Sequence, residues 1–376
     1  MNINIIKNQT NAVVTEIYGK LRQGSFTKDR IKELEETLST KIYESEKMIT
    51  QCKKNNHQAA QEEFYRRRTL LKRLADGLAW ILLDYDFHKI FGCSIGHSAG
   101  FMYGKEGYLT ERRFINDAFN NPNVVSAIQC DITNILHLAD ILVFTRDKGI
   151  QPIEIKGCTS KHDRRSIRQR NRHNEIVQLI NMGKSEAVLV KNTPFRSVET
   201  NMVYTHYWDV LENLSIDALK CGFSWQLLDK CVYLAVCNSR SRISSEDFLS
   251  SISDADWENG SIIISSLSRH LNKNLNNIPP YCLPITVFPI TPDIGIEFLL
   301  GNLDAVIAIN LEKFAEQFNK NGSYVLLKPH NELEVRIDRD QFTILEGAWS
   351  RILNELVTIP SFINQIFTVY QKSKII

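Results

Sequence analysis

The sequence predicts a mixed α/β protein, and three observations lead to this fold class. The first hundred of the 376 residues repeat apolar side chains at helical spacing. From residue 110 the pattern changes to the order α-β-β-β-α-β, and further helix-like and strand-like runs follow residue 195. We therefore expect three parts. They are a helical arm over 1–100, a core over 101–195 and a C-terminal α/β domain over 196–376.

Composition narrows the class of protein. Hydrophobic residues make up 43% and charged residues 23% of the chain, which is typical of soluble globular proteins. The formal net charge is only +2, so any basic surface for nucleic acid must be local. No two of the eight cysteines form a CxxC pair, which removes sequence support for a zinc site. Without a visible secretory signal or an apolar run of about 18 residues, we expect a cytoplasmic protein with free thiols and no membrane partner.

Two amphipathic helices are predicted in the arm. Thr27 can cap the first helix, and a polar break at Lys53–Asn56 separates it from the second. A short polar turn between two long helices predicts an antiparallel hairpin. Its apolar stripes are Ile31, Leu34, Leu38, Ile42 and Ile49, then Ala60, Phe64, Leu71, Leu74, Leu78 and Leu82. The hairpin serves packing or dimerisation, or it clamps nucleic acid through Arg66, Arg67, Arg68, Lys72 and Arg73.

Further elements follow in order along the chain. The glycine-rich residues 91–109, which include His97, are expected to form a loop. In the core we predict a helix over Thr110–Asn120, strands over Val124–Cys130, Asp140–Phe144 and Pro152–Lys156, a helix over 163–182 and a strand over Ala187–Lys191. In the C-terminal part we predict strands over Cys231–Cys237, Pro284–Pro289, Tyr324–Lys328 and Leu333–Ile337, and helices over 311–320 and 345–366.

A hairpin joins the second and third predicted strands of the core. Asp147-Lys148-Gly149 suits a three-residue turn with glycine in the left-handed position. That turn would place Leu142 opposite Glu154 and Asp140 opposite Lys156. Because strand side chains alternate, Asp140, Glu154 and Lys156 would then share one face, and a slip of one residue would separate them.

These three side chains suggest a metal site. Two carboxylates a few ångströms apart repel each other unless a cation joins them, and hard oxygen ligands suit Mg²⁺ or Mn²⁺. Such an ion lowers the pKa of a bound water and offsets charge on a phosphorane-like transition state. The alternative is a surface hairpin with an ordinary polar face. The apolar runs around Ile141–Phe144 and at Ile153 and Ile155 argue for burial and so favour the metal site.

Glu111 and Asp131 are further acids near these strands. Glu111 lies on the same side of its predicted helix as Phe114 and Ile115, so it can face the sheet and complete the metal shell. The alternative for Glu111 is a first-turn glutamate favoured by the helix dipole. Asp131 is interpreted as a turn residue in preference to an acid that supports the metal ligands. His137 is a weaker candidate for proton transfer.

The segment from 110 to 191 resembles the PD-(D/E)XK nuclease superfamily. The resemblance rests on Glu111, Asp140 at a strand start, the Glu154-Ile155-Lys156 triplet, and the helix and strand that follow. Ala139 stands where many members have proline. The resemblance implies a restriction-endonuclease-like αβββαβ core in which Asp140, Glu154 and Glu111 hold the metal and Lys156 positions water. It also implies Gln169, in preference to Arg165 or Arg172, as a polar helper near the scissile phosphate.

The predicted helix after the triplet is basic. Only one acid, Asp163, interrupts this run, and Arg side chains at such density are suited to phosphate contacts. A solvated basic face is the alternative. The predicted nucleic-acid contacts are Lys161, Arg164, Arg165, Arg168 and Arg172.

Together these features predict a Mg²⁺-dependent (or Mn²⁺-dependent) nuclease that cuts DNA, with RNA left open. Antiphage defence or restriction is the expected setting. A homodimer or a complex with a partner protein is the expected assembly, in which the helical arm and the C-terminal domain choose the substrate or the dimer partner. The competing hypothesis is a non-catalytic nucleic-acid-binding or assembly subunit that retains a nuclease fold.

Overall fold

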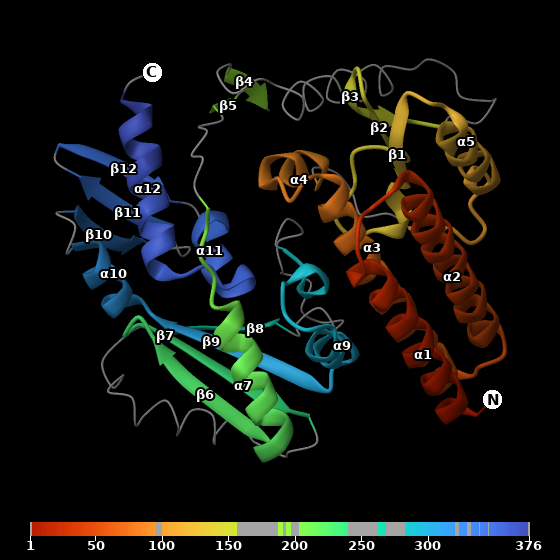
Figure 1. Ribbon diagram of the computed structural model, residues 1–376, viewed down its shortest axis with the longest axis horizontal. Helices are drawn as coiled ribbons and strands as arrows, with labels where there is room; N and C mark the ends of the chain where they lie inside the picture. Colours follow the sequence, from red (N-terminus) through yellow and green to blue (C-terminus); the bar gives the residue numbers. More distant parts are fainter. Residues whose placement is uncertain are drawn as a thin grey trace. The chain divides into compact units, whose positions relative to one another are not determined.

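Two compact units divide the chain, residues Met1–Ser197 and Val198–Ile376, and both are traced in Figure 1. Both combine helices with antiparallel sheets, so the predicted mixed α/β class is confirmed. No helix among the described residues has the length and apolar character needed to cross a membrane. The computed structural model describes residues 2–94, 100–155, 187–190, 193–196, 203–239, 262–267, 283–319, 323–328, 332–337, 339–344 and 346–374.

Long helices form the first part of unit 1 (Figure 1). They are α1 (Ile3–Arg22), α2 (Lys28–Lys54), α3 (Gln58–Leu82) and the short α4 (Phe87–Ser94). Thr27 caps α2 as predicted, because its side chain accepts a hydrogen bond from the backbone N–H of Arg30. The predicted apolar stripe of α2 is buried along its whole length, and α2 packs against α3 across the turn at residues 55–57. The predicted helical hairpin is confirmed, and α1 packs on α3 beside it.

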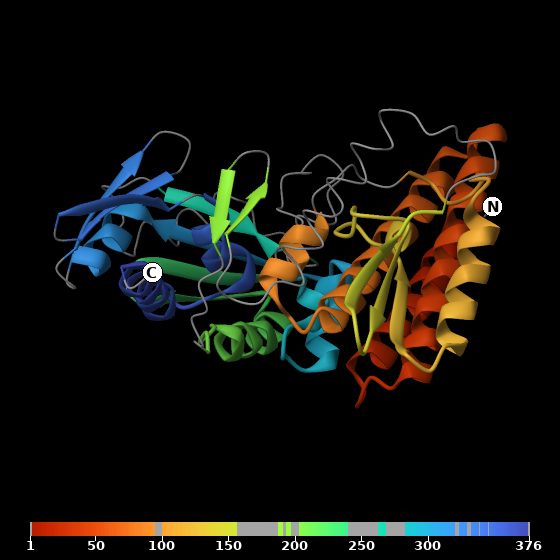
Figure 2. The ribbon, with the colours of Figure 1, turned by 90° about the horizontal axis from the view of Figure 1, so that it is seen from above.

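A three-stranded antiparallel sheet follows the helices. Helix α5 (Tyr108–Asn120) leads into β1 (Val124–Gln129), the 3-10 turn η1 (Cys130–Ile132), β2 (Ile141–Thr145) and β3 (Gly149–Ile153). The strand order is β1-β2-β3. Apolar side chains from α2, α5 and one face of the sheet form a shared core, including Ile31, Ile115, Phe119, Ala127 and Val143. Figure 2 shows the yellow sheet beside these helices, so the predicted arm and core form one compact unit.

The hairpin between β2 and β3 has a different register from the predicted one. Thr145 pairs with Gly149 and Leu142 with Pro152, so the turn is Arg146–Lys148 and the pairing has shifted by two residues. The side chain of Thr145 explains the shift, because its hydroxyl accepts from the N–H of Lys148 and donates to the carbonyl of Gly149. Gly149 itself has a φ of +66°, as a left-handed turn position requires. Strand β3 therefore ends at Ile153, and the predicted strand over Pro152–Lys156 is wrong in its bounds.

The remaining segments of unit 1 differ in part from expectation. The predicted loop over 91–109 is wrong at both ends, because α4 continues to Ser94 and α5 begins at Tyr108. His97 and the predicted helix over 163–182 lie outside the described residues. The strand predicted at Ala187–Lys191 is present as β4 (Ala187–Val190), and it pairs with an unpredicted strand, β5 (Thr193–Arg196).

Unit 2 is built on a four-stranded antiparallel sheet and a separate three-stranded one, with orders β6-β7-β9-β8 and β10-β11-β12. Helix α7 packs on β6 and β7, and one apolar core joins the sheets to the helices of this unit. Its helical elements are α7 (Trp208–Cys221), η3 (Ile285–Val287), α9 (Pro292–Leu300), α10 (Leu311–Asn319), α11 (Glu346–Glu355) and α12 (Ile359–Ser373). Its strands are β6 (Phe223–Leu228), β7 (Val232–Asn238), β8 (Ile262–Ser266), β9 (Leu303–Asn310), β10 (Ser323–Lys328), β11 (Glu332–Ile337) and β12 (Asp340–Ile344).

Two predictions for this unit are wrong. The apolar run over Pro284–Pro289 forms the 3-10 turn η3 in place of a strand. The helix predicted over 345–366 is two helices, because the chain turns at Leu356, which has a φ of +60°. The next helix, α12, has its N-cap two residues later, at Thr358, and Pro360 lies in its first turn. The predicted elements corresponding to β7, β10, β11 and α10 are confirmed within a residue or two.

The basic residues of α3 are engaged within unit 1. Arg68 Nε lies 2.6 Å from a carboxylate oxygen of Glu46, and Arg66 Nη1 lies 2.8 Å from Glu63. Arg73 and Arg67 pair at longer distances with Asp76 and Glu44. These contacts favour the packing interpretation of the hairpin over the nucleic-acid clamp, since the guanidinium groups already have anionic neighbours.

Lys72, the remaining member of the predicted clamp, is buried and leads to a prediction about stability. Its side chain is only 4% exposed, and burial, with Arg68 adding to the effect, lowers its pKa from 10.5 to about 8. A lowered pKa means that the folded state disfavours the charged amine, so the cost is full below pH 8 and disappears as pH rises past 10.5. Lys72→Met is expected to raise the free energy of unfolding by about 3 kcal/mol at pH 7 and by about 1 kcal/mol at pH 9.5.

Urea-dependent hydrogen exchange, followed on peptides from α2 and α3, measures this change within unit 1. Lys47→Met on the exposed side of α2 is the matched control and should change stability by less than about 0.5 kcal/mol at either pH. A destabilised Lys72→Met protein, or a gain that does not shrink between pH 7 and 9.5, would contradict the prediction.

Candidate active site

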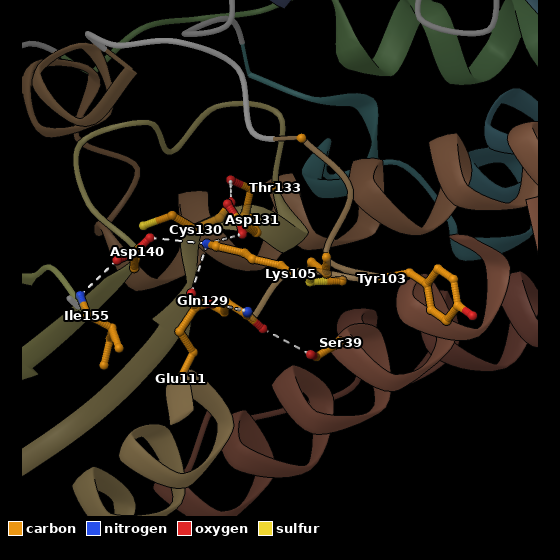
Figure 3. A network of polar contacts seen from close by, with 12 residues as sticks. Ser39, Tyr103, Lys105, Glu111, Gln129, Cys130, Asp131, Thr133, Asp140 and Ile155 are labelled. Atoms are coloured by element: carbon orange, nitrogen blue, oxygen red, sulfur yellow. Dashed lines mark hydrogen bonds and ion pairs between the residues drawn. The ribbon is translucent and has the colours of Figure 1, made fainter. Parts of the chain in front are cut away.

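Three carboxylates converge on one ammonium group in unit 1, at the ends of β1 and β2. Lys105 Nζ lies 2.8 Å from Glu111 Oε1, 2.8 Å from Asp131 Oδ2 and 3.2 Å from Asp140 Oδ1. The acids come from α5, from η1 and from the residue before β2. Figure 3 shows the lysine side chain reaching into the space between them. Elements that are separate in the sequence thus bring three anions to one point.

Glu111 is the most buried of the three acids. It lies in the first turn of α5, and its side chain is 1% exposed. Its second oxygen accepts a hydrogen bond of 2.6 Å from Gln129 Nε2, and Ser39 on α2 donates to the other end of that amide. Burial raises the pKa of Glu111, and its contact with Lys105 opposes that rise. The chain Ser39–Gln129–Glu111 fixes the orientation of this carboxylate.

Gly107 leaves room for Glu111 to approach. A Cβ at position 107 would lie 3.2 Å from Glu111 Oε1, which is closer than most side chains allow. The absence of a side chain at this position therefore keeps the oxygen free to face Lys105.

Asp140 links the acidic cluster to the chain beyond β3. Its Oδ2 accepts a 2.8 Å hydrogen bond from the backbone N–H of Ile155, and its own carbonyl accepts from the N–H of Cys130. The first bond holds the backbone between Glu154 and Lys156 beside Asp140. The second ties the start of β2 to the end of β1. The ladder of the sheet therefore sets the position of this carboxylate, which is 21% exposed.

Asp131 and Lys105 complete the cluster. Asp131 lies in η1, two residues after the end of β1. The sequence favoured a turn role for it, whereas the structure places its carboxylate against Lys105. Its position just after a strand, like that of Asp140 just before one, is the sequence signal for this role. Lys105 lies in the glycine-rich stretch and carries no sequence signal for this role.

The turn that carries Lys105 is anchored from α2. Glu46 is fully buried, and one of its oxygens accepts hydrogen bonds of 2.6 Å and 3.0 Å from the backbone N–H groups of Met102 and Tyr103. Gly104 follows with a φ of +87°, and the N–H of Lys105 closes the turn onto the carbonyl of Met102. The backbone at Lys105 is thus fixed on both sides, which aims its side chain at the carboxylates.

The electrostatics of the cluster are unbalanced. With all three acids ionised, three negative charges surround one positive charge. Burial alone would lower the pKa of Lys105, but hydrogen bonds to Asp131 and Glu111 raise it overall, so the amine stays charged. The surplus of negative charge favours a cation of higher charge at the same point.

Of the predicted site residues, the structure brings together Asp140 and Glu111 around Lys105. Glu154 is exposed and lies one residue beyond β3, outside the strand in which it was predicted. His137 is half-buried, and burial lowers its pKa, which leaves its ring neutral at pH 7. The predicted residues Lys156, Lys161, Arg164, Arg165, Arg168, Gln169 and Arg172 lie outside the described residues.

The donor set is all oxygen, and its spacing fits an ammonium. Within the described ranges, no three His, Cys, Asp or Glu side chains stand at the spacing of metal ligands. Nitrogen-to-oxygen distances of 2.8 to 3.2 Å exceed the roughly 2.0–2.1 Å that Mg²⁺ requires. No protein-family model, curated protein or solved structure matches the chain.

Proposed function

We propose that the protein is a metal-dependent nuclease that hydrolyses phosphodiester bonds of DNA. The observation that carries this proposal is the meeting of Asp140 and Glu111 around a single cation, with Asp131 as a third acid. Carboxylates gathered this closely need a cation, and phosphoryl chemistry is a common use of such a cluster.

The order of elements supports a restriction-endonuclease-like core. Helix α5 precedes an antiparallel sheet of order β1-β2-β3, with Asp140 directly before β2 and Glu154 directly after β3. Antiparallel pairing sets Ile141 opposite Ile153, so the two acids adjoin the same end of that strand pair. This arrangement agrees with the one that the resemblance implies, over the part of the core that the structure describes.

The chemistry of the donor set suits Mg²⁺ or Mn²⁺. These ions prefer carboxylate oxygens and keep several water molecules, which leaves room for a phosphate oxygen. When bound, such an ion supplies an activated water molecule and a positive charge that stabilises the negative charge of the transition state. In this proposal Asp140, Glu111 and Glu154 hold the ion, and Asp131, for which the sequence favoured a turn role, adds a fourth carboxylate.

Other residues of the chain hold the substrate. Lys156 follows Ile155, whose N–H is bonded to Asp140, and in the proposal its ammonium orients the attacking water. Gln169 assists near the scissile phosphate. Lys161, Arg164, Arg165, Arg168 and Arg172 bind phosphates along the DNA, which makes binding strongly dependent on salt. A homodimer or a partner protein would position a second strand for cutting, as in restriction or antiphage defence.

The test is a cleavage assay with supercoiled plasmid, single-stranded DNA and RNA. We expect nicking or linearisation of the plasmid with Mg²⁺ or Mn²⁺ and none with EDTA. Glu154→Ala and Lys156→Ala proteins, purified in parallel, should lose activity and so exclude a contaminating nuclease. Equal cutting in EDTA, or unchanged cutting by both variants, would refute the proposed site.

The position of Lys105 among the three acids favours a second candidate function. Because its ammonium already fills the centre of the cluster, the fold can stand without a metal, as expected of a non-catalytic DNA-binding or assembly subunit. That protein would retain DNA in a gel-shift assay and leave the plasmid intact under every metal condition. The same two assays therefore separate the candidates.

A further inference from the structure

The ammonium of Lys105 and a divalent ion require the same position. Its three contacts, at 2.8, 2.8 and 3.2 Å, use one oxygen from each acid. A divalent ion held by the same three oxygens would take the place of Nζ among them, with the oxygens drawn in to roughly 2.0–2.1 Å from the ion. Moreover, two cations at this distance repel each other. The three carboxylates can therefore hold the lysine or the ion, but not both.

The side chain of Lys105 is free to leave while its backbone stays in place. It is 34% exposed, so the ammonium can turn into solvent by rotation about its own stem. Its backbone is held by bonds to Met102 and Tyr108, and Glu46 fixes the preceding residues. Exchange of the lysine for an ion thus needs only a change of rotamer and a small inward movement of the carboxylates.

We propose that Lys105 is a built-in competitor of the divalent ion, whose ammonium leaves the three carboxylates when the ion binds. This inference rests on the proposed function and adds regulation to that same site. The lysine offsets part of the negative charge of the acids when the ion is scarce, and it raises the ion concentration at which the site fills. Released into solvent at the rim of the site, the ammonium is also available to a substrate phosphate.

The expected effect is a change in ion affinity. Removing the competitor should tighten Mn²⁺ binding at least about tenfold, because a single charge-assisted hydrogen bond is worth more than one tenfold step and Lys105 makes three contacts. The variants are Lys105→Met and Lys105→Gln, of which the second keeps a polar side chain and guards against misfolding. Lys148→Met, in the exposed turn between β2 and β3, is the matched control.

Electron paramagnetic resonance measures the free Mn²⁺ in a solution of the 376-residue chain, and the bound Mn²⁺ is the total minus the free ion. Thermal unfolding is followed with and without Mn²⁺. We expect tighter binding and a larger Mn²⁺-induced rise in Tm for both Lys105 variants, wild-type behaviour for Lys148→Met, and loss of binding for Lys105→Met combined with Asp140→Asn.

Two results overturn the inference in distinguishable ways. If wild type and the Lys105 variants bind Mn²⁺ with equal affinity, or the variants bind more weakly, the competitor role is wrong and the nuclease proposal stands. If neither wild type nor either variant binds Mn²⁺, both the competitor role and the metal site of the proposed function are wrong.

Discussion

Asparagine in place of Asp140 is expected to lower the rate of DNA cleavage at least about 100-fold, since losing even an outer partner of a metal ligand costs 10- to 100-fold. The substitution removes a negative charge from the cluster but keeps an oxygen that can accept from the N–H of Ile155. The loop after β3 should therefore stay in place while ion binding is lost. Single-turnover cleavage of a labelled duplex at saturating Mn²⁺ measures the effect.

The matched control for this variant is Asp147→Asn. Asp147 lies in the exposed turn between β2 and β3, so the same change of charge on the same sheet should leave cleavage within about twofold. Circular dichroism of both proteins checks that the fold is intact. Cleavage by Asp140→Asn at the wild-type rate would remove Asp140 from the proposed mechanism.

Alanine in place of Glu46 is expected to lower the free energy of unfolding of unit 1 by about 3–5 kcal/mol. Glu46 is fully buried, pairs with Arg68 at 2.6 Å and accepts two backbone N–H groups from the turn that carries Lys105. Its removal leaves the guanidinium without its buried partner and two donors unsatisfied. Urea-dependent hydrogen exchange on peptides from α2 and α3 gives the change in stability.

Glu44→Ala provides the comparison on the same helix. Glu44 is 48% exposed, pairs with the partly exposed Lys41 at 3.0 Å, and lies 3.9 Å from Arg67, whose side chain is 12% exposed. Such pairs contribute little, so this change should cost less than about 1 kcal/mol. In addition, peptides over residues 100–107 should exchange faster in Glu46→Ala than in Glu44→Ala. Equal stability of the two variants would show that the buried pair is not what holds the turn.

The helical hairpin illustrates what could be predicted from local patterns. Apolar side chains at helical spacing, a capping Thr27 and a polar break suffice to define α2 and α3. The register of the sheet was harder to predict from the sequence. The strands were predicted, but the turn between β2 and β3 depends on hydrogen bonds of the Thr145 hydroxyl. A two-residue shift in register keeps every side chain on the same face of the sheet, so the apolar pattern cannot distinguish the two turns.

The residues of the candidate site were likewise predicted only in part. Asp140 and Glu111 were predicted because strand starts and first helical turns can be located from the sequence. Lys105, Asp131 and Gln129 were missed as members of the cluster, because their roles depend on contacts across the fold. Lys72 shows the reverse error, since a basic run on a helix suggested a surface and the packing of α3 buried this amine.

The sequence alone determined the mixed α/β class, the helical hairpin of α2 and α3, the order α5-β1-β2-β3 and two of the acids at the site. Those features depend on the period of apolar residues and on residue types at the ends of elements, which are local properties. Only the tertiary structure decided that the acids surround the Lys105 ammonium and that the turn at Gly104 positions this lysine. Attraction between charges acts through space, so Lys105 meets Asp140, and Glu46 reaches the turn before Lys105, only once the helices and the sheet have packed together.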